Sequence, residues 1–272
     1  MKATLTRAIG GLFFVFFILT MFSLEAGFAA EKEDKPVISI TPRLWYTNMN
    51  INEYNPSTTY QETWKHLNIP IYGVTIGFAP KSLKSTEFLL TVLHGTGNTQ
   101  GTVVNANGNT TPATVDLKRH DLELLVRHKI AESGVYLFYG PRYFLIEFDA
   151  TFKPGWTHDA TNTNRLRFEE TIILAQLGLG MSVPITKDEK HILFGNVIGG
   201  IGRIEDKVEN RATSDSPDKK FTAYSVDVQM GYQLALTKGF SAHTRYRAVT
   251  IYDNSGDATV IHGPEIGLKF SF

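Results

Sequence analysis

The chain has 272 residues, with 27 basic and 27 acidic side chains and therefore a formal net charge of zero. Balanced charge argues against a general nucleic-acid-binding protein, which usually carries a strong basic excess. The absence of cysteine excludes disulfides, thiolate metal sites and a lipid-modified N-terminal cysteine.

The first 29 residues have the composition of a secretory signal peptide. Lys2 and Arg7 make the start basic, residues 9–22 form an apolar run, and small residues precede a cleavage position after Ala29. The run of 14 residues is shorter than the roughly 20 that a membrane-spanning helix needs, which favours cleavage over a retained anchor. We therefore expect an exported protein with three regions: a signal peptide (1–29), a short polar segment (30–36) and one folded domain (37–272).

Beyond residue 36 the dominant pattern is an alternation of apolar and polar side chains. In "YSVDVQMGYQLAL", residues 224–236, every second residue is apolar and the others are Ser, Asp, Gln, Gly or Ala. Such alternation is typical of a β-strand with one apolar and one polar face. Along the chain it predicts ten strands, at 37–48, 69–79, 86–96, 114–129, 135–148, 165–183, 191–205, 221–236, 240–252 and 258–272.

Two features interrupt this pattern. Residues 136–147 and 166–175 alternate less cleanly, and a bulge near Glu169 and Glu170 would restore the phase of the second segment. Four prolines fall inside predicted strands, where they cannot donate a ladder hydrogen bond. We expect bulges or rim positions at these prolines, which are Pro42, Pro70, Pro141 and Pro264.

The connections between the predicted strands alternate in length. The first, third, fifth and seventh are polar and have 20, 17, 16 and 15 residues, whereas the even-numbered ones have 3 to 7. Long outer loops, short periplasmic turns and periplasmic termini are expected of an outer-membrane barrel. The ninth connection, 253–257, is short and departs from this rule. A secreted β-sandwich also alternates, but strand length and loop asymmetry favour an all-β fold, a transmembrane antiparallel up-and-down barrel of about ten strands.

The last eight residues, "EIGLKFSF", resemble the C-terminal β-signal of bacterial outer-membrane proteins. Glu265, Gly267, Phe270 and Phe272 match its polar residue, its glycine and its two aromatic residues. The resemblance implies that the barrel-assembly machinery inserts this chain into the outer membrane. The expected partners are then outer-membrane lipid, lipopolysaccharide and that machinery.

The polar faces of the predicted strands carry many charges. Placing a charge on the lipid face costs about 2–4 kcal/mol for Arg or Lys at the midplane, so the charged face must point inward. Ten strands lie near the size at which side chains fill the lumen. This leaves two hypotheses: the charges pair with one another, or Arg245 and Arg247 select anions in a narrow conduit. The predicted lumen residues are Arg43, Glu87, Glu123, Arg127, Arg142, Glu170, Asp227, His243, Arg245, Arg247, Glu265 and Lys269.

Catalytic motifs are weak. A barrel of ten strands resembles the omptin proteases. That resemblance implies catalytic residues at the outer rim, an Asp pair that faces an Asp–His pair. The predicted loops offer only His158–Asp159, with Asp253 and Asp257 around "NSG". The His-x-Ser motif of outer-membrane lipid hydrolases does not occur in the sequence. The glycine-rich segment "GNVIGGIG" lacks the lysine of a phosphate-binding loop. No pair of histidines has the spacing of a zinc site. The sequence predicts no enzyme, no metal and no cofactor.

Aromatic residues in the predicted outer loops are candidates for a binding surface. They are Tyr54, Tyr60, Trp64 and Trp156. The function most consistent with the sequence is a non-catalytic structural or surface-binding barrel with a charge-filled lumen. The alternatives are a narrow porin-like channel for small solutes and a hydrolase at the rim.

Overall fold

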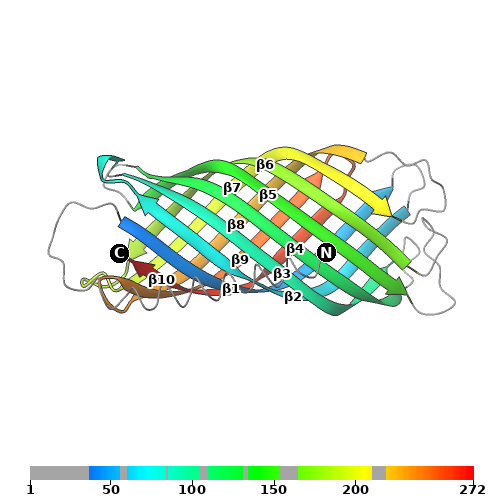
Figure 1. Ribbon diagram of the computed structural model, residues 1–272, viewed down its shortest axis with the longest axis horizontal. Helices are drawn as coiled ribbons and strands as arrows, with labels where there is room; N and C mark the ends of the chain where they lie inside the picture. Colours follow the sequence, from blue (N-terminus) through cyan, green and yellow to red (C-terminus); the bar gives the residue numbers. More distant parts are fainter. Residues whose placement is uncertain are drawn as a thin grey trace, which may run out of the picture. The chain divides into compact units, whose positions relative to one another are not determined.

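A computed structural model describes residues 37–55, 60–83, 85–104, 110–130, 134–152, 165–209 and 219–272. Ten antiparallel strands form a closed barrel in which each strand pairs with its sequence neighbours and β10 pairs with β1 (Figure 1). This confirms the predicted fold class and the strand count. The signal peptide (1–29) and the polar segment (30–36) lie outside the described residues. None of the helices among the described residues could span a membrane.

The elements are β1 (Val37–Asn55), β2 (Tyr60–Ala79), a 3-10 turn η1 (Lys81–Leu83), β3 (Thr86–Val104), β4 (Thr110–Lys129), β5 (Val135–Phe152), β6 (Arg165–Pro184), β7 (His191–Glu209), β8 (Lys219–Ala235), β9 (Phe240–Asp253) and β10 (Ala258–Ser271). The short connections gather at the end of the barrel where β1 begins and β10 finishes (Figure 1). We call this the turn end and the opposite end the loop end. Most strands extend further toward the loop end than the alternation predicted.

The irregular positions have specific explanations. Pro42, Pro141 and Pro264 lie at gaps in the β1–β10 and β4–β5 ladders, where no hydrogen bond to the missing N–H is required. Pro70 lies in the stretch where the β2–β3 register shifts, a bulge that also contains His66 at φ 62°. Pro70 therefore agrees with the expected bulge, whereas the other three prolines lie at ladder gaps without a register shift, which was not predicted.

The prediction of a bulge near Glu169 and Glu170 is wrong. Both residues continue the β5–β6 and β6–β7 ladders without a change of register. The alternation looks broken there because the inward face of β6 is itself apolar, with Ile172 and Leu174 buried inside the barrel. Apolar side chains therefore occur on both faces of this strand.

The half of the barrel nearest the turn end has an apolar exterior. On β1 the outward apolar residues run from Ile38 to Tyr46, which is nine residues of strand. On β6 the outward Leu177 and Leu179 are 62% and 55% exposed. A tilted strand needs roughly 9–11 residues to cross the hydrocarbon core of a bilayer. The height of this apolar belt therefore matches one membrane.

The loop-end half has the opposite exterior. After Tyr46, the outward residues of β1 are Asn48, Asn50 and Asn52. After the apolar start of β3, its outward residues include Asn98 and Gln100, whose amides donate to Asp116 and Thr114 of β4. Polar side chains facing out are suited to water, so this half projects beyond the belt.

The inward face of the wall changes from polar near the turn end to apolar near the loop end. On β1 it passes from Thr41 and Arg43 to the buried Met49 and Ile51. The exterior switches at one line across the first four strands, which we call the polarity boundary: Tyr46, Tyr72, His94 and His120. On the turn side of this line the barrel is apolar outside and polar inside, and on the loop side it is built like a water-soluble domain.

A lysine substitution tests where the belt ends. Leu177→Lys, in the middle of the belt on β6, is expected to lower the free energy of unfolding by about 2–4 kcal/mol because its charge faces lipid. Thr96→Lys, outward and exposed on the loop side of the polarity boundary, is expected to change it by less than about 0.5 kcal/mol. Urea titrations in phospholipid vesicles compare the two. Equal losses would show that both sites share one environment.

Candidate functional site

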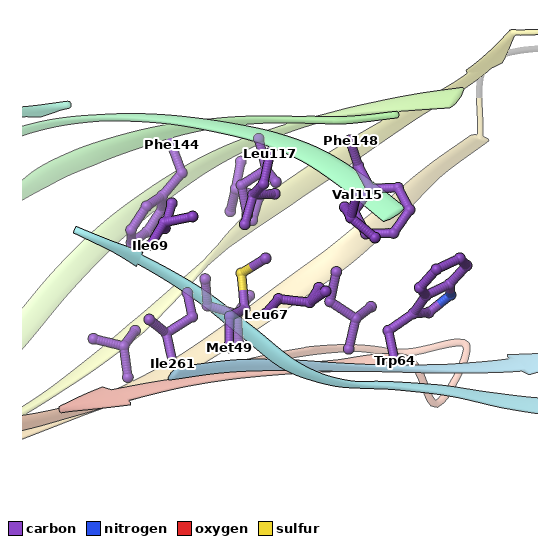
Figure 2. Close-up of a cluster of buried hydrophobic side chains, with 14 of the residues drawn as sticks. Met49, Trp64, Leu67, Ile69, Val115, Leu117, Phe144, Phe148 and Ile261 are labelled. Atoms are coloured by element: carbon purple, nitrogen blue, oxygen red, sulfur yellow. The ribbon is translucent and has the colours of Figure 1, made fainter. Parts of the chain in front are cut away.

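The interior of the loop-end half is filled by a cluster of buried apolar side chains, which we call the apolar plug. Side chains from β4 and β5 face those from β1, β2 and β10 across the interior (Figure 2). Its central members are Met49, Trp64, Leu67, Ile69, Val115, Leu117, Phe144, Phe148 and Ile261, all of them almost completely buried. Burial of large side chains on this scale gives the projecting half a hydrophobic core of its own.

Aromatic rings pack around Trp64 near the loop end of the plug. The ring centroids of Trp64 and Phe148 lie 4.6 Å apart at an edge-to-face angle, and Phe152 lies 5.6 Å from Trp64. On its other side Phe148 stacks on Phe168 at 4.6 Å. Such ring pairs contribute beyond the apolar area that they bury.

This position corrects one prediction. Trp64 was expected on a surface loop, but it lies within β2, points inward and is 0% exposed. The strand extends into the predicted loop because its inward residues there pack in the plug. Tyr54 and Tyr60 lie at the loop ends of β1 and β2, and Trp156 lies outside the described residues.

Beneath the plug, toward the turn end, lies a network of buried charges. Arg119 binds Asp121 through two hydrogen bonds of 2.7 Å. Arg142 bridges two carboxylates, at 3.2 Å from Asp121 and 2.9 Å from Asp227. Arg247 donates to Asp227 as well. We call this group the ion-pair layer and include Glu123, 3.6 Å from Arg142: Arg119, Asp121, Glu123, Arg142, Asp227 and Arg247.

Two aromatic rings join the ion-pair layer to the plug. Trp45 has the guanidinium carbons of Arg119 and Arg247 at 5.4 and 5.0 Å from its ring centre, and its indole N–H donates to the carbonyl of Gly263 at 3.2 Å. Phe144 lies 4.0 Å from the guanidinium carbon of Arg142. These cation–π contacts join the charged layer directly to the apolar plug.

A second charged group lies closer to the turn end. Glu265 accepts hydrogen bonds from Arg245 at 2.8 Å and from Arg43 at 3.4 Å. Arg245 also donates to Gln229, whose amide donates to Asp227 at 3.0 Å, so the two groups are connected. At the turn end itself, Glu87 pairs with Arg127 and lies 3.8 Å from Lys269.

The twelve predicted lumen residues all lie on the inner wall, but one of them stands apart. Glu170 lies within the loop-end half, opposite Asp206 across the β6–β7 pair. Two members of the ion-pair layer were missed, Arg119 and Asp121. They share the strand face of Glu123 and Arg127, so the period of two could have found them.

The four residues of the C-terminal signal take both sides of the last strand. Glu265 belongs to the inner charge network, and the ring of His243 lies over Gly267, where a Cβ would strike it. Phe270 points outward and stacks on Phe240 at 5.0 Å. Phe272 follows β10 and is exposed.

Candidate catalytic groups do not converge in the part of the chain that the structure describes. No three His, Asp or Glu side chains there are placed to hold a metal ion. Asp253 caps a turn, because its carboxylate accepts bonds from the backbone of Ser255, Gly256 and Asp257. The segment "GNVIGGIG" lies inside β7 and opens no helix. His158 and Asp159 lie outside the described residues.

The sequence matches no protein-family model. No curated protein matches it. Among solved structures, the outer-membrane protease OmpT from Escherichia coli is similar, with a TM-score of 0.58 and 14% identity over 90% of this chain and 99% of OmpT. The translocator domain of the autotransporter NalP from Neisseria meningitidis aligns with a TM-score of 0.47 and 12% identity over 92% of each chain. The fold of this chain is that of a bacterial outer-membrane β-barrel.

Proposed function

We propose that this protein is a closed, non-catalytic barrel of the bacterial outer membrane that anchors its projecting strands and loops at the cell surface. One observation carries the proposal: the plug side chains that point into the barrel are almost completely buried. A water-filled passage at that level would leave the side chains that line it accessible to solvent. Burial at this depth therefore favours a barrier over a channel.

The ion-pair layer supports the same conclusion. Arg245 and Arg247, the pair that would select anions in a conduit, are engaged by Glu265 and Asp227. Arg119, Arg142 and Arg247 are almost completely buried, so water does not reach them. Among the described residues of the ion-pair layer, each arginine is paired with a carboxylate, so none of these cations is left to attract a passing anion.

The apolar belt supports an integral position in the membrane, and the likeness to outer-membrane barrels agrees with it. Export by the signal peptide, assembly through Glu265, Gly267, Phe270 and Phe272, and contact with lipopolysaccharide are parts of the same proposal. The loop-end half is the part that is presented at the cell surface, because its polar exterior and long connections extend beyond the apolar belt.

Conductance tests this function. Purified protein, shown to be folded by heat-modifiable electrophoresis, is expected to produce no current steps in a planar bilayer. A porin-like channel would give steps on the order of a few hundred picosiemens, and such steps would contradict the proposal. A hydrolytic activity that is lost in both His158→Ala and Asp159→Ala would contradict its non-catalytic part.

A further inference from the structure

The interior near the turn end opens to solvent in a graded way. Along β9, β10 and β1, side-chain exposure falls from 30% at Lys269 to 15% at Arg43, 7% at Arg245 and 1% at Arg247. These three strands are adjacent in the barrel wall. A row of cations therefore leads from the turn end toward the ion-pair layer, where it stops.

Charge is balanced in the deep part of this region and unbalanced near the opening. The ion-pair layer contains three arginines and three carboxylates, which neutralise one another. Nearer the turn end, four cations share two carboxylates, Glu87 and Glu265. These six residues, taken together, leave two positive charges over: the four cations are Arg43, Arg127, Arg245 and Lys269.

The same region contains hydrogen-bond donors without acceptors. The donors Arg43 Nε and Arg245 Nε are buried and have no partner among the described residues, and neither has the ring nitrogen His243 Nε2, which donates or accepts according to its tautomer. Arg43 and His243 both pair with Gly267 in the ladders, so their side chains enter the barrel at one level on either side of a glycine. Buried donors without acceptors destabilise a protein, and an acceptor placed between them would relieve that cost.

We propose that Lys269, Arg43 and Arg245, together with the ring of His243, form a site that binds a small soluble oxyanion entering from the turn end. The planar fork of arginine matches the paired oxygens of phosphate or carboxylate. A doubly charged anion offsets the two excess positive charges, and its several oxygens can accept from the donors that lack partners. The ion-pair layer closes the inner end, so the site is a dead end and not part of a pathway.

Anion binding at this site does not depend on the proposed surface role or on the absence of conductance; only the closed inner end of the site does. The experiment titrates inorganic phosphate into the full-length protein in a detergent with an uncharged headgroup, using calorimetry at constant ionic strength. The expected result is saturable binding with a Kd of about 1 mM or tighter. Sulfate and succinate are also expected to bind saturably. Chloride at the same ionic strength is expected to show no saturable binding.

Two variants remove a cation from the site and leave each carboxylate with another cationic partner. In Arg43→Gln, Glu265 keeps Arg245 at 2.7 Å, and in Lys269→Gln, Glu87 keeps Arg127. Each is expected to weaken phosphate binding about tenfold or more while the heat-modifiable mobility of the folded barrel is unchanged. Lys190→Gln is the control, because Lys190 lies in the β6–β7 connection at the same end and pairs with Asp188 at 3.5 Å.

Unchanged binding in Lys190→Gln together with weak binding in the other two variants supports the site. Failure of the wild-type protein to bind phosphate saturably would overturn it. The same holds if Arg43→Gln and Lys269→Gln bind as tightly as the wild type, since the anion would then be attached elsewhere.

Discussion

Replacing Asp227 by asparagine is expected to lower the free energy of unfolding by about 3–5 kcal/mol, the cost typical of breaking a buried charge pair. Asp227 is completely buried and accepts hydrogen bonds from Arg142, Arg247 and Gln229. Its neutral amide would leave two buried guanidinium groups with one carboxylate fewer. The side chain keeps its shape, so the loss reports the charge and not the volume.

The matched control is Lys118→Gln. Lys118 pairs with Glu147 at 3.0 Å on the outer surface, where the two side chains are 51% and 31% exposed. Exposed pairs of this kind contribute about 0–1 kcal/mol. Urea titrations of both variants in the same vesicles give the difference. If Asp227→Asn were no more destabilising than Lys118→Gln, the ion-pair layer would not stabilise the barrel.

Truncating the plug is expected to have a similar effect. Phe148→Ala removes the ring that lies between Trp64 and Phe168 and leaves a cavity in a closely packed interior. Core changes of this type cost about 3–5 kcal/mol. The same vesicle titration measures this loss.

Leu122→Ala is the control for the plug. Leu122 faces outward within the belt and is exposed, so lipid chains can fill the space that it leaves. Its loss of stability should be clearly smaller than that of Phe148→Ala. A Phe148→Ala variant as stable as Leu122→Ala would mean that the plug is not a packed core.

The fold could be predicted because alternation and loop length are local properties of the chain. A period of two identifies strands without knowledge of their partners. The inward positions followed once lipid was taken as the surroundings of the apolar face, and Arg245 and Arg247 were placed on that basis.

The plug could not be predicted in the same way. Beyond the polarity boundary the apolar face turns inward, and the predicted strands leave three plug residues, Met49, Trp64 and Leu67, in the first long connection. On β3, residues 97–104 read "GNTQGTVV", and only Val103 marks their inward face with a large apolar side chain. On β2 the bulge near His66 shifts the phase between Trp64 and Leu67. The contacts across the barrel that bury them depend on the closed structure.

Cysteine labelling tests the polarity boundary most directly. The natural chain has no cysteine, so a single introduced cysteine reports one position. We choose four outward positions on β3, two on each side of His94: Leu90, Val92, Asn98 and Gln100. The protein is reconstituted in vesicles and treated with a membrane-impermeant maleimide.

The structure predicts that cysteines at 90 and 92 are protected until detergent is added, and that cysteines at 98 and 100 react at once. Rapid labelling at all four positions in intact vesicles would show that the apolar belt does not contact lipid. Protection at all four would show that the loop-end half lies within the membrane, and either result would contradict the inverted polarity of the barrel.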